Sequence, residues 1–141
     1  MKIRLYEKGD EQEIKQLIEA SLKEVFNAPA TNLEDLDDVK ANFEKFWVLE
    51  NKSEIIGTLG VKKEGWDARI SRMYVKKSER GKGIGKHLME KALAYCDKHK
   101  FTRIILTTFK RMNSKGFYEK MGFREFDFET DTGRFWMEYQ K

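Results

Sequence analysis

Apolar residues recur at the spacing of an amphipathic helix in two places in the N-terminal part of the chain. The first set is Ile14, Leu17, Ile18, Leu22 and Val25. Residues 10–13 before it have the Asp-x-x-Glu form of a capping box, which predicts a helix that ends at a break over 27–30. The second set is Leu33, Leu36, Val39 and Phe43. It follows a Thr-x-x-Glu capping box at 31–34 and predicts a shorter helix.

Runs rich in β-branched and aromatic residues predict the strands. They cover residues 3–6, 46–50, 54–61, 68–75 and 102–107, and a turn at 51–53 makes the second and third a hairpin. We predict further helices over 83–99 and from Asn113 or Ser114 to 120, then a hairpin of 123–129 with 134–139. The order β-α-α-β-β-β-α-β-α-β-β predicts a mixed α/β (α+β) fold, with a largely antiparallel central sheet and helices on both faces.

A glycine-rich turn between the strand at 68–75 and the helix at 83–99 is suited to binding an anion. The segment is Arg80-Gly81-Lys82-Gly83-Ile84-Gly85-Lys86. The first amides of a helix have no internal partners, and the helix dipole adds partial positive charge there. Glycines let these amides approach a ligand, and the basic side chains add formal charge. We therefore expect a phosphate or pyrophosphate at this turn.

The spacing excludes two common phosphate-binding motifs. In a Walker A alignment, Arg80 replaces the first glycine and His87 replaces the hydroxyl residue. In a dinucleotide-binding fingerprint, Gly85 comes one residue early, and no βαβ unit opens the chain. What the segment does match is Arg-x-x-Gly-x-Gly.

Arg80 to Gly85 resembles the acetyl-coenzyme A pyrophosphate loop of the GNAT superfamily of N-acetyltransferases. The preceding Arg72-Met73-Tyr74-Val75 looks like the strand that leads into that loop, and Phe117 to Phe123 is similar to the family's second signature. The element order also matches over essentially the whole chain. The resemblance implies a single N-acetyltransferase domain, residues 1–141, with acetyl-coenzyme A as cosubstrate.

The resemblance also implies roles for particular residues. Main-chain groups of Met73, Tyr74 and Val75 would contact the pantetheine arm as an added strand does. Arg80, Gly81, Lys82, Gly83, Ile84, Gly85 and Lys86 would hold the pyrophosphate. Tyr118 matches the tyrosine that protonates the departing thiolate, a role compatible with a phenol of pKa near 10. Its alternative role is that of an aromatic packing residue beside Phe117.

Two positions depart from the family pattern. Many relatives carry a glutamate near the position of Arg69 that helps to deprotonate the amine, and no carboxylate stands there. Glu50, Glu64, Asp67 or a chain of water molecules remain as alternatives for the base. The family often has an asparagine seven residues before the helix tyrosine, where this chain has Arg111. Asn113 either replaces it as a pantetheine contact or caps the following helix.

Composition limits the other partners. The net charge is +4, from 28 basic and 24 acidic residues that are interleaved along the chain, which disfavours a nucleic-acid binder. Cys96 is the only cysteine and lies in an apolar helical pattern, so we expect a core residue in a cytoplasmic protein. His87 and His99 have no neighbouring metal ligands, so no metal site is expected. No apolar run suggests a signal peptide or membrane span.

The acceptor is left open by the sequence. It is a polyamine, an amino acid, an aminoglycoside or a protein amine, and Phe26, Phe109 and Trp136 are candidate walls of its pocket. The alternative functions are a protein or peptide N-acetyltransferase and an acyl-coenzyme A sensor without catalysis. The aromatic hairpin at 123–139 is either core or the interface of a homodimer, which the resemblance allows.

Overall fold

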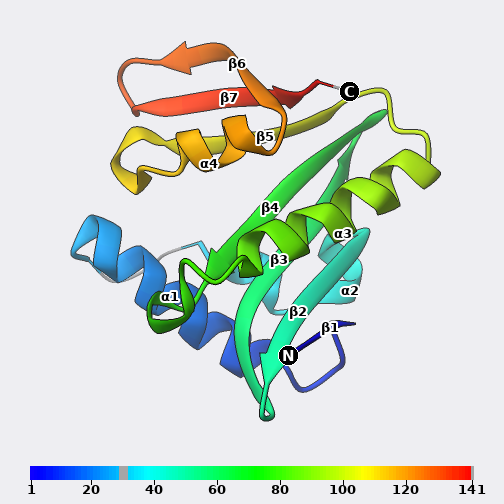
Figure 1. Ribbon diagram of the computed structural model, residues 1–141, viewed down its shortest axis with the longest axis vertical. Coiled ribbons are helices and arrows are strands. Elements are labelled where there is room, and N and C mark those ends of the chain that lie inside the picture. Colours follow the sequence, from blue (N-terminus) through cyan, green and yellow to red (C-terminus); the bar gives the residue numbers. More distant parts are fainter. Residues whose placement is uncertain (29–31, 141) are drawn as a thin grey trace.

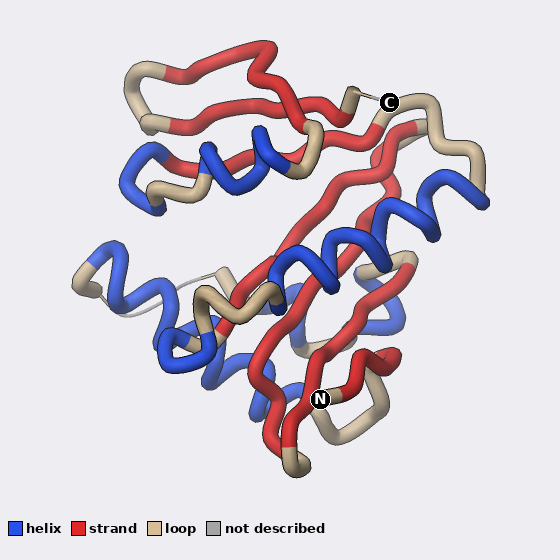
Figure 2. The backbone as a smooth tube through the Cα atoms, in the orientation of Figure 1, coloured by secondary structure: helices blue, strands red, loops and turns tan. Residues whose placement is uncertain are grey.

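Seven strands form one sheet in the computed structural model, which describes residues 1–28 and 32–140 (Figures 1 and 2). They are β1 (Lys2–Leu5), β2 (Lys45–Asn51), β3 (Glu54–Glu64), β4 (Asp67–Val75), β5 (Ile104–Phe109), β6 (Phe123–Glu129) and β7 (Arg134–Tyr139). The spatial order is β1-β2-β3-β4-β5-β7-β6, and only the β4–β5 pair is parallel. The predicted mixed and largely antiparallel sheet is confirmed.

Helices cover both faces of this sheet. The α-helices are α1 (Glu11–Phe26), α2 (Val39–Asn42), α3 (Ile84–Lys98) and α4 (Lys115–Lys120). Single 3-10 turns occur at Glu34–Leu36, Lys77–Glu79 and Lys110–Met112. In Figure 1, α3 crosses in front of β2, β3 and β4, whereas α2 lies behind them. None of the helices in the described part of the chain is long and apolar enough to cross a membrane.

Each face of the sheet has its own hydrophobic core. Leu88, Met89 and Ala92 of α3 are fully buried against one face, together with Cys96. Ile14 and Ile18 of α1 are fully buried against the other face, with Phe43 and Phe46. The strands therefore lie between two layers of helices. Close packing on both faces fixes the positions of the strands and so limits the conformations of the segments that connect them.

Strands β4 and β5 separate soon after they meet. Their parallel pairing is limited to Ala68 with Ile104 and Arg69 with Ile105. Figure 1 shows the two strands side by side at one end of the sheet and diverging toward α1. Beyond residue 69, the edge of β4 that faces β5 has no ladder partner among the described residues. The main-chain groups along this edge are therefore available to another extended group.

A bulge on β4 lies within the divergent part. Thr58 pairs with Tyr74 and Gly60 with Ser71, so Arg72 and Met73 together oppose Leu59. Arg72 has a positive φ of 54°, which a side chain other than glycine rarely adopts. The fully buried Thr58 hydroxyl donates to the Arg72 carbonyl at 2.9 Å and helps to hold this conformation. Bulges of this kind often re-aim side chains next to functional sites.

The first predicted capping box is wrong, although the helix itself is present. Asp10 makes no side-chain bond to the amides of α1, because its carboxylate accepts from Arg4 at 2.9 Å and from the Glu7 amide at 2.8 Å. Glu13 accepts instead from the Ile55 amide at 2.7 Å. Both carboxylates that the pattern assigned to the cap therefore bind groups outside the helix.

The second predicted helix is divided in two. Leu36 belongs to the 3-10 turn, and α2 starts only after Asp38, whose carboxylate accepts from the Ala41 amide at 3.1 Å. The first residue of the predicted capping box, Thr31, lies outside the described residues, as do Pro29 and Ala30 of the predicted break. Before them, α1 ends at Phe26 because Asn27 adopts a left-handed conformation.

The C-terminal hairpin is partly core. Phe123 is buried against the α3 face, whereas Phe126 at the bulge of β6 is 49% exposed. The predicted spans 123–129 and 134–139 are those of β6 and β7. The predicted strand at 102–107 is displaced, because β5 covers 104–109 and residues before it form the connection from α3.

Candidate functional site

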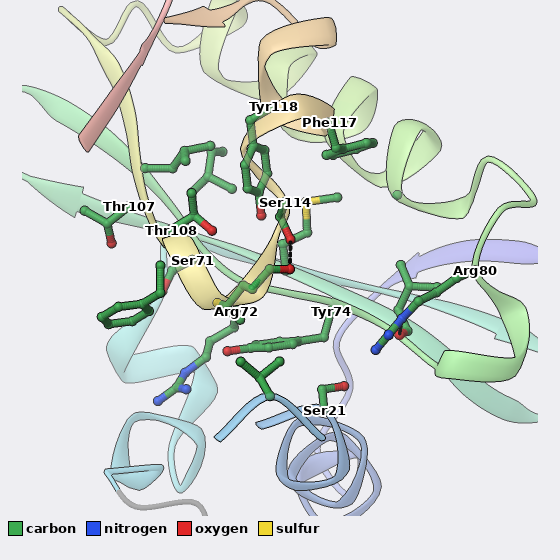
Figure 3. A pocket seen from close by; sticks show the side chains of 18 of the residues that line it. Ser21, Ser71, Arg72, Tyr74, Arg80, Thr107, Thr108, Ser114, Phe117 and Tyr118 are labelled. Carbon is green, nitrogen blue, oxygen red and sulfur yellow. Dashed lines mark hydrogen bonds between the residues drawn. The ribbon is translucent and has the colours of Figure 1, made fainter. Parts of the chain in front are cut away.

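A cleft of about 860 Å³ opens where β4 and β5 diverge. Its walls come from β4, the start of α3, the end of β5 and α4, with the C-terminal part of α1 across the opening (Figure 3). Tyr118 and all the residues predicted to bind the cosubstrate, except Lys82, border this cleft. Segments that are far apart in sequence are thus brought around one cavity.

The glycine-rich turn forms one end of the cleft. Gly81 and Gly83 have φ values of 82° and 81°, which explains why glycine is required at both positions. Gly85 is needed for space, because a Cβ atom there would lie 3.1 Å from Cε of Met73 and 3.3 Å from the Phe117 ring. No side chain caps α3 at Gly83, so its first amides face the cleft entrance without a side-chain acceptor.

The basic side chains of this turn differ in their surroundings. Arg80 donates to Glu24 of α1 at 2.8 Å and to the Val75 carbonyl at 3.0 Å. Lys82 lies outside the cleft and donates to Glu79 at 2.5 Å. Lys86 borders the cleft. An anion at the turn would meet Arg80 and Lys86, and it would compete with Glu24 for the Arg80 guanidinium.

Tyr118 of α4 presents its hydroxyl to the middle of the cleft (Figure 3). The ring is held edge-to-face against Phe117 and Phe123, with centroids 5.3 and 6.3 Å apart. Burial raises the pKa of this phenol well above its ordinary value, and the nearby Tyr74 hydroxyl adds to the effect. The ring of Tyr118 therefore packs among aromatic side chains, while its hydroxyl lies at the cleft and stays protonated at neutral pH.

The side chains of Asn113 and Arg111 lie in different surroundings. Asn113 borders the cleft and has a left-handed conformation, with φ of 57°. The Arg111 guanidinium lies over the Phe26 ring, 5.5 Å from its centroid. Ser114, and not Asn113, directly precedes α4, and its hydroxyl donates to the Met112 carbonyl at 3.2 Å. Asn113 therefore lines the cavity and does not occupy the cap position of α4.

The half of the cleft away from the glycine turn contains charged groups that sequence reasoning missed. Asp35 accepts from Nε and Nη2 of Arg72, at 3.1 and 2.9 Å, and from Lys62 at 3.0 Å. Burial alone would raise the pKa of Asp35, but the hydrogen bonds from these two cations hold it below its ordinary value. Ser71, Thr107 and Thr108 add hydroxyl groups to the same walls.

The three carboxylates considered as bases are placed differently. Glu50 pairs with Arg4 at 3.2 Å, and Asp67 pairs with Arg103 at 3.0 Å; neither borders the cleft. Glu64 does border it and pairs with Arg69 at 3.2 Å. Among these three candidates, only Glu64 lies within the cavity.

Of the predicted acceptor walls, Phe109 lines the cleft. Phe26 packs edge-to-face on Phe109, with centroids 5.8 Å apart, and so supports it from behind. Trp136 lies under the Arg69 guanidinium, 5.2 Å from the ring centroid. The aromatic residues therefore form a scaffold for the polar groups rather than a bare apolar pocket.

Other nucleophiles and metal ligands are not gathered in the described part of the chain. Cys96 is buried in the α3 core, as predicted, and burial raises the pKa of its thiol to about 11. Residues 1–28 and 32–140 hold no cluster of His, Cys, Asp and Glu side chains with the arrangement of a metal site. Cys96 does not border the cleft, whereas the Tyr118 side chain does.

Comparison with known proteins gives a family match and several relatives. The family model described as "Acetyltransferase (GNAT) family" matches residues 11–123. The chain is 30% identical over 98 residues to the N-acetylaspartate synthetase of Homo sapiens, and 29% identical to that of Danio rerio. These alignments cover 64% of this chain but only 32% and 35% of those proteins, so the chain spans about a third of their length.

Solved structures share the fold over nearly the full chain. A GNAT-family acetyltransferase from Staphylococcus aureus superposes with a TM-score of 0.85 and 25% identity, over 99% of each chain. The PaiA N-acetyltransferase of Thermoplasma acidophilum, in complex with coenzyme A, superposes with a TM-score of 0.81 and 20% identity, over 100% of each chain.

Proposed function

Because the chain belongs to the GNAT family of N-acetyltransferases, we propose that it transfers an acetyl group from acetyl-coenzyme A directly to the primary amine of a small molecule. The observation that carries the proposal is the cleft between β4 and β5, which joins the glycine-rich turn to the Tyr118 hydroxyl in one cavity. The cavity holds both an anion-binding end and a proton donor, as transfer from a phosphorylated thioester requires.

The cosubstrate would lie along β4. Backbone amides of residues 81–86, with Arg80 and Lys86, suit its pyrophosphate. Main-chain groups of Met73, Tyr74 and Val75 suit the pantetheine amides, because the described residues give β4 no ladder partner on its β5 side there. Asn113 supplies a further polar contact. Lys82 adds little to this site, because its ammonium lies outside the cleft and is paired with Glu79.

Transfer proceeds by attack of the neutral amine on the thioester carbonyl. A carbon–nitrogen bond forms, the carbon–sulfur bond breaks, and the thiolate leaves with the electron pair. Tyr118 donates its proton to this thiolate, and the attacking nitrogen loses its extra proton to water. Burial raises the pKa of Tyr118, so the phenol keeps its proton at neutral pH until a strongly basic thiolate forms beside it.

Glu64 is the carboxylate that we assign as the candidate base. Glu64 is the one candidate carboxylate that borders the cleft, but it is ion-paired with Arg69 and more than a third exposed. The two alternatives for the base, a carboxylate and a chain of water molecules, are compatible if water carries the proton from the amine to Glu64. Glu64→Gln should then lower kcat mainly below pH 8, where a protonated amine needs the base most.

A small acceptor is favoured over a protein. The cleft is bordered by α1, α4 and the 3-10 turn at residues 34–36, and its volume of about 860 Å³ is within the range of small-molecule sites. The name of the curated relatives also specifies a small product, N-acetylaspartate. An acyl-coenzyme A sensor without catalysis is the alternative that the experiment below separates.

The test measures free thiol release from acetyl-coenzyme A with a panel of amines, and coenzyme A binding by calorimetry. Tyr118→Phe should lower kcat at least about tenfold, with little change in the coenzyme A Kd. Tyr139→Phe is the matched control, because its ring also packs on Phe123 but does not border the cleft. Unchanged kcat in Tyr118→Phe would sink the acid role. Binding without turnover would favour the sensor, and absence of coenzyme A binding would overturn the proposal.

A further inference from the structure

The half of the cleft beyond Tyr118 carries an excess of positive charge. Its charged lining residues are the cations Lys62, Arg69 and Arg72 and the carboxylates Asp35 and Glu64. Asp35 is shared by Lys62 and Arg72, so one carboxylate serves two cations. At the glycine end, by contrast, the two lining cations, Arg80 and Lys86, are matched by two lining carboxylates. The excess therefore lies where an acceptor would bind.

Arg69 is the cation that is best placed to meet an acceptor. It stands at the last residue pair of the β4–β5 ladder, at the point where the strands separate. Its Nη2 donates to the Thr107 hydroxyl at 2.9 Å, and its guanidinium lies over the Trp136 ring. These contacts fix the plane of the guanidinium at the floor of the cleft and reduce the side-chain entropy that binding would cost.

The Arg69 guanidinium keeps donors free for a ligand. Its five N–H groups exceed the two bonds that it makes, to Thr107 and to Glu64. The Glu64 carboxylate is 44% exposed, and an ion pair of that kind is weak and easily displaced. Arg72 is different, because Asp35 and the Asn32 carbonyl already occupy it.

We propose that the acceptor is an amino acid or another small aminocarboxylate, and that Arg69 binds its carboxylate. The proposal rests on the acetyltransfer proposed above. A carboxylate would compensate the excess charge and match the planar guanidinium with two parallel hydrogen bonds. A polyamine or aminoglycoside would instead bring several positive charges to a site that is already positive.

Thr107 links this contact to the reaction centre. Thr107 and Thr108 are consecutive on β5, and both line the same cleft as Tyr118 (Figure 3). A carboxylate held by Arg69 and Thr107 therefore leaves the amine of the same small molecule on the side of the cavity where the thioester would lie. Arg69 acts here as a specificity-determining residue that contacts the substrate and takes no part in proton transfer.

The experiment compares acceptors that differ only in the carboxylate. Thiol release is measured with the twenty standard L-amino acids, β-alanine and γ-aminobutyrate, each beside its carboxamide, and with spermidine and kanamycin. We expect kcat/KM for the best carboxylate acceptor to exceed that of its carboxamide by about tenfold or more. Arg69→Gln should abolish that preference, Arg69→Lys should keep part of it, and the KM for acetyl-coenzyme A should change less than about twofold in both.

Two variants serve as controls. Arg124→Gln makes the same change on the exposed part of β6, outside the cleft, and should leave the preference intact. Glu64→Gln removes the carboxylate that competes for the Arg69 guanidinium, so the preference for carboxylate acceptors should be kept or strengthened. Thermal unfolding of each variant separates loss of preference from loss of folding.

Two outcomes would overturn this inference without the acetyltransfer proposal, and a third would remove both. Turnover with spermidine, kanamycin or carboxamides that equals or exceeds turnover with carboxylates overturns the inference and leaves the transferase intact. Equal losses for carboxylates and carboxamides in Arg69→Gln show that Arg69 only supports the strand, which also overturns it. Turnover with no member of the panel removes the proposed small-molecule transferase and the inference together.

Discussion

Asp35→Asn tests whether the ion pairs under the cleft hold the β4 bulge in place. Asp35 accepts two hydrogen bonds from Arg72 and one from Lys62. The Asp35 and Arg72 side chains are only 15% and 17% exposed, so solvent replaces little of what is lost. Asparagine keeps the shape but removes the charge, which leaves two cations without their counter-ion.

The expected loss follows from those contacts. A hydrogen bond to a charged group contributes about 1.5–3 kcal/mol, and breaking a buried pair costs about 3–5 kcal/mol. Lys62 is 30% exposed and regains part of its hydration, so its share is small. Asparagine also retains one acceptor for Arg72. We therefore expect the free energy of unfolding to fall by about 2–4 kcal/mol at pH 7.

Activity should fall as well, because Arg72 is the left-handed residue of the bulge. That conformation costs about 1–2 kcal/mol for a non-glycine residue, and the Asp35 pairing helps to maintain it. A relaxed bulge would displace Met73 and Tyr74 from the cleft wall. We expect kcat/KM for acetyl-coenzyme A to drop by about tenfold in the folded variant.

The pH dependence gives an independent check. The pKa of Asp35 is lowered in the folded state, so its contribution is fully present above the unfolded pKa of about 4. It is lost as the pH falls through the lower folded pKa. The stability difference between wild type and Asp35→Asn should thus shrink below about pH 4.

Urea unfolding followed by tryptophan fluorescence measures both effects. Asp37→Asn is the matched control, because Asp37 pairs with Lys15 at the surface, its side chain is 61% exposed, and its loss should cost less than about 1 kcal/mol. A loss in Asp35→Asn as small as in that control, or a difference that grows at low pH, would refute the argument.

Three further changes test other parts of the structure. Gly60→Ala places a Cβ 2.6 Å from an aromatic ring, so the melting temperature should fall by several degrees. Gly116→Ala is the control, because the space around Gly116 on α4 is open, and the melting temperature should stay unchanged or rise. Glu24→Gln frees Arg80 for phosphates, so the coenzyme A Kd measured by calorimetry should decrease, and an unchanged or higher Kd would contradict the competition. Cys96 has a pKa of about 11 when folded and near 9 when unfolded, so wild-type stability should fall by up to about 2–3 kcal/mol between pH 9 and 11. Cys96→Ala should remove that part of the decline in urea titrations, and an identical pH profile would contradict it.

The order of the elements and the nature of the cleft were accessible from sequence because local rules determine them. Period-two and helical patterns identified the sheet and helices, and their hydrophobic faces leave few ways to pack. The glycine turn was recognisable because Gly81 and Gly83 need positive φ and Gly85 needs space. Tyr118 followed from its place in a short motif.

Side-chain partners were less accessible. Both carboxylates of the first predicted capping box, Asp10 and Glu13, bind groups outside the helix start, one of them 42 residues away in the chain. A capping box assumes that the local amide is the best available donor. Once β1 and β3 place Arg4 and the Ile55 amide nearby, these tertiary donors are preferred, and the local pattern loses its predictive value.

By itself, the sequence determined a mixed sheet and a glycine-rich turn at the start of a helix, because these depend on backbone conformation and hydrophobic periodicity, while Tyr118 came from the resemblance to the family. Only the tertiary structure decided which charged side chains line the cleft. Asp35 and Arg72 are 37 residues apart, and Arg69 and Thr107 are 38 apart. No local pattern pairs residues at such separations, because their contact exists only after β4 and β5 meet, diverge and expose one cleft between them.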